Sequence, residues 1–310
     1  MIRVGCVNID TSHPGAFSQI LNAGERARYT AIYNDGFRKD DEVQGFMKAN
    51  GIVKRCMNLE EMAEQTDVAF IHSCNWDRHL EYAEPFIQLG KLVFIDKPIV
   101  GNIRDIERLR KLVKDGATIL GCSCMRYAKG ITDFLSMPIE ERGEIVSVHS
   151  SCGVDEFNYA IHAVEAIGAL LPRGAKSCQY IGGGQFQGVC SENYAICYEN
   201  GASAVYSITC GQWQRSVVTV ITTKQTFVLE IGGYEPMLDR VLTSVETGVR
   251  QTAPVEELIE SIMIMLAGRI SRKNGGMPVN LSDIPSDDPG YDGYAFEAAY
   301  AAAAPIIYAK

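Results

Sequence analysis

A lysine lies just after an apolar, strand-like run of this chain. The run spans Leu92 to Ile95, and Asp96, Lys97 and Pro98 come after it. Because open parallel sheets bind ligands at the carboxyl ends of their strands, a lysine here is placed to meet a ligand. An ammonium group whose pKa is lowered by partial burial can polarise a carbonyl or relay a proton. The alternative is a solvated surface lysine, and the tripeptide alone does not separate the two.

The first 120 residues alternate between short apolar runs and amphipathic runs. The expected strands are 2–7, 29–33, 67–71, 92–95 and 118–121, with helices at 14–23, 41–50, 59–65, 79–89 and 103–114. An extra strand could lie near residue 52. This alternation is typical of a parallel, doubly wound sheet. It predicts an α/β fold with a Rossmann-type N-terminal domain over residues 1–122.

The pattern changes near residue 125. A strand is expected at 145–151 and a helix at 159–171, followed by strands at 177–180, 193–198, 202–209, 216–222 and 226–231 and helices at 255–272 and 294–304. Closely spaced strands without intervening helices indicate an antiparallel sheet. The second domain, 123–310, is therefore predicted to be α+β with a large, mainly antiparallel sheet. We expect its C-terminal helix to pack back on the first domain.

Composition excludes several classes of partner. The chain is 46% hydrophobic and 22% charged, with a net charge of −9, which argues against nucleic acid. It contains no apolar run long enough for a membrane span and no signal-peptide layout, so a cytoplasmic location is expected. Its 10 cysteines include no Cys-x-x-Cys pair. We therefore expect no metal site, and cysteines that act as core residues in a reducing compartment.

Five segments together resemble the Gfo/Idh/MocA family of NAD(P)-dependent oxidoreductases. They are Asp96-Lys97-Pro98, Ser73 to His79, Arg126-Tyr127, Asn158 to His162, and the closing Pro278-Val279 with Phe296 to Tyr300. Their order and spacing, over most of the chain, carry the resemblance more than any one motif does. It implies a dinucleotide-binding domain followed by a domain for substrate binding and oligomerisation.

The resemblance implies that Lys97, His162 and Asn158 are catalytic. Lys97 would bind the reacting hydroxyl and shuttle its proton, with His162 as the partner acid/base. The family has an aspartate where this chain has Asn158, whose amide can orient His162 but cannot raise its basicity. A spacing of four would place both on one face of a helix. His162 could instead be a core histidine, and Glu165 either a substitute carboxylate or a solvated residue.

The turn after the first strand departs most from the family pattern. In place of Gly-x-Gly-x-x-Gly the chain has Asn8 to His13, with Asn8 and Asp10 at the first two glycine positions. A carboxylate about 4 Å from a phosphate costs about 1–4 kcal/mol, or roughly one to three decades of affinity. Thr11 and Ser12, at a helix N-terminus, could offset part of this cost. Asp10 could equally be a helix cap or turn residue.

The remaining positions follow from the same resemblance. Cofactor contacts are expected from Asn8, Asp10, Thr11, Ser12, His13, Asn34, Asp35, Ser73, Asn75, His79 and Asp96, and substrate contacts from Arg126, Tyr127, Tyr159 and Trp213. An acidic residue after the second strand takes ribose hydroxyls and disfavours a 2′-phosphate, so Asn34 and Asp35 favour NAD over NADP. Asp35 could instead start a turn, and His79 could cap or pack its helix.

The resemblance thus predicts an NAD(P)-dependent oxidoreductase acting on a hydroxyl of a sugar, cyclitol or related polyol. One alternative is a redox-neutral enzyme that performs elimination or epimerisation through transient oxidation with bound NAD. The other is a degenerate, non-catalytic sensor or partner subunit, which Asn8 and Asp10 motivate. We expect a homodimer or homotetramer formed through the C-terminal sheet, with no nucleic-acid or membrane partner.

Overall fold

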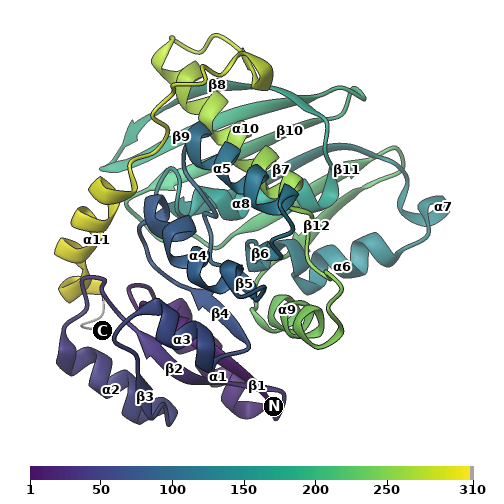
Figure 1. The fold of residues 1–310 in the computed structure, drawn as a ribbon. Coiled ribbons are helices and arrows are strands. Elements are labelled where there is room, and N and C mark those ends of the chain that lie inside the picture. Colours follow the sequence, from purple (N-terminus) through teal and green to yellow (C-terminus); the bar gives the residue numbers. More distant parts are fainter. Residues whose placement is uncertain (308–310) are drawn as a thin grey trace. The chain divides into compact units, whose positions relative to one another are not determined.

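The computed structural model describes the backbone of residues 1–307 and the side chains of residues 1–304 (Figure 1). The chain forms two compact units. Unit 1 contains Met1–Gly121, Leu238–Val255 and the residues from Pro289 onward, and unit 2 contains Cys122–Met237 and Glu256–Asp288. The division is not linear in sequence, because two late segments join the first unit.

Unit 1 is built on a six-stranded sheet in the order β3-β2-β1-β4-β5-β6. The strands are β1 (Ile2–Val7), β2 (Ala27–Tyr33), β3 (Lys54–Arg55), β4 (Val68–Ile71), β5 (Leu92–Ile95) and β6 (Ile119–Gly121), all paired in parallel. β3 supplies the extra strand near residue 52. The chain reverses its direction of winding between β1 and β4, which is where Rossmann-type sheets bind ligands. The predicted α/β class is confirmed.

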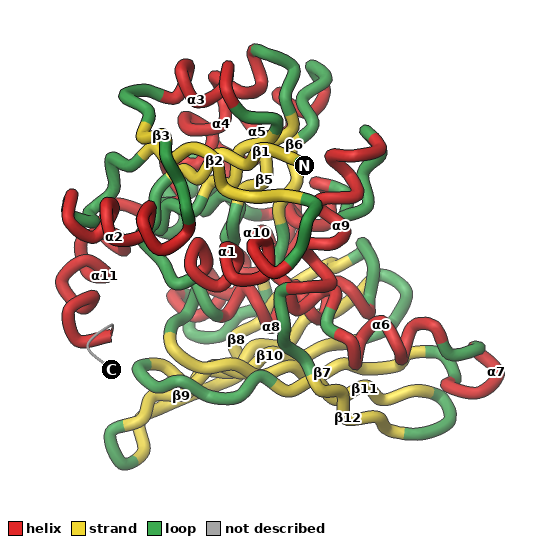
Figure 2. The backbone as a smooth tube through the Cα atoms, turned by 90° about the horizontal axis from the view of Figure 1, so that it is seen from below, coloured by secondary structure: helices red, strands yellow, loops and turns green. Residues whose placement is uncertain are grey.

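Helices cover both faces of this sheet. They are α1 (His13–Ala23), α2 (Asp40–Asn50), α3 (Leu59–Gln65), α4 (His79–Gln88) and α5 (Ile103–Lys114). Figure 2 shows α3, α4 and α5 on one face and α1 and α2 on the other. Local signals set their ends: Asn58 and Asn102 accept backbone N–H groups as N-caps, and Gly51 ends α2 with φ 65°.

Two later helices complete unit 1. From α9 (Glu235–Thr247), Asp239 and Glu246 pair with Arg26 at 2.5 and 2.7 Å. α11 (Gly293–Ile307) lies beside α2 in Figures 1 and 2. Phe296 of α11 packs on Trp76 with ring centroids 4.9 Å apart. The C-terminal segment therefore contributes to the carboxyl edge of the first sheet.

Unit 2 contains a seven-stranded mixed sheet in the order β12-β11-β7-β10-β9-β8-β13. Its strands are β7 (Ile145–Val154), β8 (Ala175–Phe186), β9 (Val189–Tyr198), β10 (Ser203–Cys210), β11 (Val217–Thr222), β12 (Thr226–Glu230) and β13 (Val279–Asn280). The pairings are antiparallel except for β7 with β10. The predicted α+β domain is confirmed, and the parallel pair was not foreseen.

The helices of unit 2 are α6 (Lys129–Ser136), α7 (Ile139–Arg142), α8 (Ala160–Leu170) and α10 (Val255–Lys273). The sequence did not predict α6, α7 or α9. In α6, an added Cβ on Gly130 would lie 2.3 Å from the Glu230 carbonyl oxygen, so only glycine allows the helix to pack this closely on β12. Glycine has a low helix propensity, and this weakens the sequence signal for α6. Within residues 1–307, no helix combines the length and apolar character needed to cross a membrane.

Side chains of the second sheet alternate between a covered and an open face. Figure 2 shows α6 and α8 on one face, while none of the described helices covers the other. The outward positions of β7, β10 and β11 include no Asp, Glu, Lys or Arg. They include Ser147, Ser151, Val205, Ser207, Val217, Thr219 and Ile221. This uncharged face is unusual for a sheet that meets water on one side.

Candidate functional site

A buried carboxylate organises the carboxyl edge of the first sheet. Asp96 follows β5, is 4% exposed, and accepts hydrogen bonds from His13 Nδ1 at 2.7 Å and His72 Nδ1 at 3.0 Å. Its other oxygen accepts the Lys97 backbone N–H at 2.8 Å. With Nδ1 of His72 donating, Nε2 accepts the Tyr29 hydroxyl at 2.9 Å. Asp96 therefore joins the ends of β4 and β5 to the start of α1.

The environment fixes the charges in this network. Burial opposes ionisation of Asp96, but His13 and His72 outweigh it and hold its pKa well below the usual range. Burial lowers the pKa of His72, outweighing the attraction of Asp96. At neutral pH Asp96 is thus a carboxylate and His72 a neutral donor.

Lys97 is buried at the end of β5, with 8% of its surface exposed. The alternative of an ordinary solvated lysine is therefore wrong. Its peptide bond to Pro98 is cis, and its N–H is held by Asp96. The hydrogen bond to Asp96 holds the backbone of Lys97 at the carboxyl edge of the sheet.

Asn8 replaces the first glycine of the turn in conformation as well as position. It has φ 62°, in the left-handed region that asparagine tolerates better than most residues. Its Oδ1 accepts the N–H groups of Asp35 and Gly36 at 3.0 and 3.3 Å. Its Nδ2 is buried without a hydrogen-bond partner. The turn thus holds one buried donor in need of an acceptor.

Asp10 does not cap α1, so the helix-cap alternative is wrong. Its Oδ2 instead accepts the Cys74 N–H at 3.1 Å, while Oδ1 is buried without a partner. An added Cβ on Gly36 would lie 2.1 Å from Oδ1, so only glycine fits opposite this carboxyl group. One ligand-type atom each of Asp10, Cys74 and Glu297 lies within 4.8 Å of the other two.

Burial raises the pKa of Asp10 to about 6. Glu297 acts in the same direction as burial, whereas the Cys74 N–H and Arg38 lower the pKa. The carboxyl group at the second glycine position therefore changes its charge near pH 6. Thr11 and Ser12 lie beside it: Thr11 Oγ1 accepts the His13 N–H at 3.2 Å, and Ser12 makes no side-chain cap.

The expected ribose acceptor at the end of β2 already has partners. Asp35 accepts the Tyr82 hydroxyl and the Arg78 guanidinium, each at 2.7 Å. Burial raises its pKa, but these two donors outweigh burial and lower it overall. Asn34 Oδ1 accepts the Ile9 N–H at 3.3 Å. Asp35 therefore remains charged. Asn34 links the end of β2 to the turn that follows β1.

The loop after β4 holds three further expected residues. Ser73 Oγ accepts the Asn75 N–H at 3.1 Å, and Asn75 Nδ2 donates to Glu297 at 2.9 Å. The ring nitrogens of His79 face the carbonyl oxygens of Ser73 and Ile99 at 2.8 and 3.2 Å. Burial lowers the pKa of His79. His79 thus ties two loops together, as its packing alternative anticipated.

In unit 2, a serine orients the candidate acid/base. His162 Nδ1 lies 2.6 Å from Ser123 Oγ, and the Tyr159 ring packs on the imidazole with centroids 5.9 Å apart. α8 begins at Ala160, so Asn158 lies in the preceding turn. The expectation that Asn158 and His162 share a helix face is wrong, because Asp155 accepts the Phe157 and Tyr159 N–H groups and closes that turn.

Glu165 and Arg126 form a buried support behind His162. Glu165 is 2% exposed, so its solvated alternative is wrong. Its Oε2 accepts the Ser123 N–H at 2.9 Å and Arg126 Nε at 2.8 Å. Arg126 also donates to Glu257 of α10 at 3.0 Å. Arg126 thus anchors the Ser123 segment between two helices.

The other two expected substrate contacts differ in exposure. Tyr127 is 9% exposed and lies in the segment Cys124–Tyr127 that Arg126 anchors. Trp213 is 73% exposed, in the loop after β10. Unit 2 therefore gathers Arg126, Tyr159 and His162 around Ser123, and leaves Trp213 at its surface.

The family of the N-terminal segment follows from a comparison of sequences. Residues 4–122 match a family model described as an oxidoreductase family with an NAD-binding Rossmann fold. This segment belongs to the Gfo/Idh/MocA family. The resemblance inferred from the motifs is confirmed here.

Known proteins of this type match the chain to different extents. A protein from Amycolatopsis mediterranei named as a UDP-kanosamine synthase oxidoreductase subunit is 31% identical over 102 residues, 33% of this chain and 28% of that protein. Myo-inositol dehydrogenase from Lactobacillus casei, in complex with NAD(H) and myo-inositol, has TM-score 0.77 and 13% identity over 90% of this chain and 96% of its own. Scyllo-inositol dehydrogenase from the same organism, with NAD(H) and scyllo-inositol, has TM-score 0.75 and 14% identity over 91% and 99%. At these identities, the structural matches establish the fold.

The sequence did not point to three residues of these networks. They are His72, Ser123 and Glu297, the last of which lies beside Asp10. His72 and Ser123 each follow closely on a parallel strand, β4 or β6, and that position was a signal available for both. Glu297 contacts Asn75 across 222 residues of sequence, and no local pattern indicates such a contact.

Replacing Glu165 tests the buried support. Glu165→Ala leaves the Arg126 guanidinium without its innermost partner, so we expect a loss of about 3 kcal/mol in the free energy of unfolding. Asp133→Ala, which removes an exposed partner of Lys129, should change it by less than about 1 kcal/mol. Urea denaturation measures both, and equal losses would contradict the assigned role of Glu165.

Proposed function

We propose that this protein is an NAD-dependent oxidoreductase acting on a hydroxyl group of a sugar, cyclitol or related polyol. The observation that carries the proposal is Lys97, buried at the carboxyl edge of a Rossmann sheet and held by Asp96. The family match of residues 4–122 supports it. So does the fold shared with dehydrogenases whose structures contain NAD(H) and an inositol.

The turn after β1 suits an anionic cofactor despite its missing glycines. Asn8 supplies the left-handed backbone and an unpartnered buried donor, and the N-terminus of α1 favours phosphate. A bound NAD would supply the acceptor for the hydride of the hydroxyl-bearing carbon. Asp35 follows β2, where an acidic residue takes ribose hydroxyls and disfavours a 2′-phosphate, and this position favours NAD over NADP.

In this proposal, Lys97 and His162 are the two groups that handle protons. Lys97 binds the reacting hydroxyl and takes up its proton. His162 donates Nδ1–H to Ser123 Oγ and uses Nε2 as the second acid/base. Asn158 and Tyr159 position the substrate. Arg126 acts indirectly, through the Ser123 segment that it anchors.

Lys97→Ala tests the catalytic assignment. We expect turnover to fall about 10²- to 10⁴-fold, because a positioned proton-transfer group is lost, while NAD still binds. NADH formation with a panel of polyols measures turnover, and calorimetry measures NAD affinity. Lys48→Ala, on the exposed side of α2, is the matched control and should keep full activity. Full activity of the Lys97 variant would contradict the mechanism.

Asp10 makes NAD affinity depend on pH. Its pKa of about 6 means that it is neutral below that pH and repels phosphate above it. NAD should therefore bind more tightly as the pH falls through about 6. At pH 8, Asp10→Asn should tighten binding by about 10- to 1000-fold and remove the pH dependence. Calorimetry at several pH values tests this, with the exposed Asp287→Asn as control; an unchanged Kd would refute the role of Asp10.

The same group affects stability. The folded-state pKa of about 6 lies above the unfolded value of about 3.9, so the folded state holds the proton more tightly. The contribution of Asp10 to stability is therefore present below about pH 4 and is lost as the pH rises to about 6. Asp10→Asn should raise the melting temperature at pH 7.5 and flatten its change across that window.

A second candidate function is that of one subunit in a larger enzyme. Such a subunit could carry out redox-neutral chemistry with bound NAD, or it could be non-catalytic. The name of the Amycolatopsis relative, an oxidoreductase subunit, favours it. Thermal shift separates the candidates, since NAD at 100 times its Kd stabilises a binding protein by about 2.7 kcal/mol. Stabilisation without consumption of NAD would favour the redox-neutral form. No stabilisation by any nicotinamide nucleotide would favour a non-catalytic subunit.

The open face of the second sheet suits a homodimer or homotetramer. Val205 lies near its centre, opposite His149 on β7 and Ala195 on β9. Val205→Asp should convert the oligomer to a monomer in light scattering, because it buries an unpaired charge at the contact. Met57→Asp places the same charge on an exposed apolar residue of unit 1 and should leave the mass unchanged. A monomeric wild-type chain would refute the proposal.

A further inference from the structure

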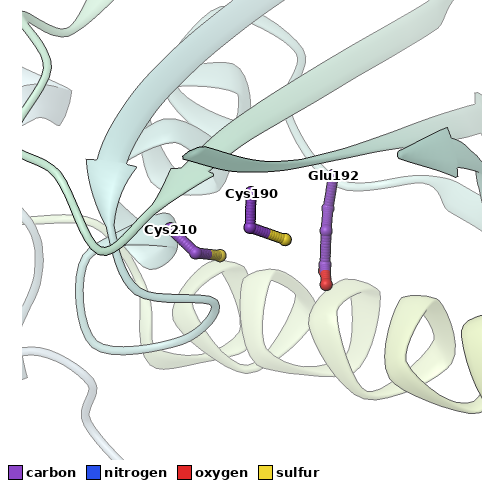
Figure 3. A group of neighbouring side chains, drawn as sticks. All are labelled: Cys190, Glu192 and Cys210. Atoms are coloured by element: carbon purple, nitrogen blue, oxygen red, sulfur yellow. The ribbon is translucent and has the colours of Figure 1, made fainter. Parts of the chain in front are cut away.

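Three potential ligand side chains converge at one end of the second sheet. Cys190 and Glu192 are two residues apart on β9, so they project from the same face. Cys210, the last residue of β10, is the register partner of Cys190. Figure 3 shows all three on the same side of the strands, with the Cys190 sulfur between the Cys210 sulfur and the Glu192 carboxylate. Their ligand atoms lie within 4.8 Å of one another.

The carboxylate of this cluster is held in place. Glu192 is 9% exposed, its Oε2 accepts the Tyr194 hydroxyl at 2.5 Å, and its Oε1 accepts Arg272 of α10. Arg272 is shared with Glu156 at 2.7 Å. The two sulfurs are reduced thiols of intermediate exposure. An ion from solvent can therefore reach them, while the oxygen is already oriented.

We propose that Cys190, Glu192 and Cys210 bind a zinc-type divalent cation, with water as the fourth ligand. Zinc takes thiolate sulfur at about 2.3 Å and carboxylate oxygen at about 2.0–2.2 Å, which places tetrahedral ligand atoms about 3.6–3.8 Å apart. These spacings lie inside the 4.8 Å within which the three ligand atoms are found. Two thiolates select zinc over magnesium or calcium, and the two thiol protons pass to solvent on binding.

The position of the cluster indicates which segment a bound cation would stabilise. Cys210 also pairs with Val154 at the end of β7. Directly after Val154 comes the turn that Asp155 closes, with Asn158 and Tyr159 in it. A cation on Cys190 and Cys210 would link the ends of β9 and β10 next to that turn. It would stabilise the segment that leads into α8 without taking part in hydride transfer.

Metal titration of the whole chain tests the site. The protein is stripped with a chelator, kept reduced with a phosphine, and titrated with Co²⁺ and then Zn²⁺. We expect a thiolate-to-cobalt charge-transfer band that one equivalent of Zn²⁺ removes. Cys190→Ser and Cys210→Ser should abolish the band and weaken Zn²⁺ binding by more than the roughly 10- to 100-fold that an outer-shell change costs. Glu192→Gln should weaken it less.

Cys197→Ser is the matched control, because Cys197 is an exposed cysteine on the opposite face of β9; it should bind zinc as the wild type does. A second readout needs no variant: Zn²⁺ should protect Cys190 and Cys210, but not Cys197, from alkylation. Neither readout depends on NAD or turnover. The proposal is overturned by absence of the band, by equal alkylation with and without Zn²⁺, or by a Cys190–Cys210 disulfide whose reduction yields no zinc binding.

Discussion

The first unit depends on one buried negative charge. An unpaired carboxylate as buried as Asp96 would be prohibitively costly, and here His13, His72 and a backbone N–H share that charge. These donors come from α1, from the residue after β4 and from Lys97, which follows Asp96 at the end of β5, so the charge fixes three elements at one point. The same contacts hold the backbone that carries Lys97, so the stability of this edge and the position of the proposed catalytic lysine have one physical origin.

The second unit also contains a buried carboxylate whose charge is balanced by its neighbours. Glu165 is a buried carboxylate that accepts a backbone N–H, from Ser123, and is balanced by a cation, Arg126. Ser123 in turn holds His162. In both units a buried carboxylate holds the segment or backbone next to a residue for which we propose a proton-transfer role. Such support is what a precisely placed acid/base requires.

The sequence predicted features whose causes are local. The strand at 92–95 and the helices at 59–65 and 103–114 were predicted, and both helices begin where an asparagine side chain, Asn58 or Asn102, accepts a backbone N–H within the first turn. Partnerships across long separations were not predictable: Ser123 with His162 spans 39 residues and Asn75 with Glu297 spans 222. Likewise, Cys190 meets Cys210 only through the register of β9 and β10, which no spacing rule for cysteines contains.

Unit 1 is formed by three separate segments of the chain, and this affects the order and the rate of folding. Contacts such as Arg26 with Glu246 and Asn75 with Glu297 join the beginning of the chain to its last quarter. During synthesis, the N-terminal sheet therefore emerges long before the helix that completes its carboxyl edge. A chain cut before Pro289 would lose the Glu297 contact and α11, and the damage would fall on the nucleotide-binding half at the other end of the sequence. High sequence separation of this kind also slows folding.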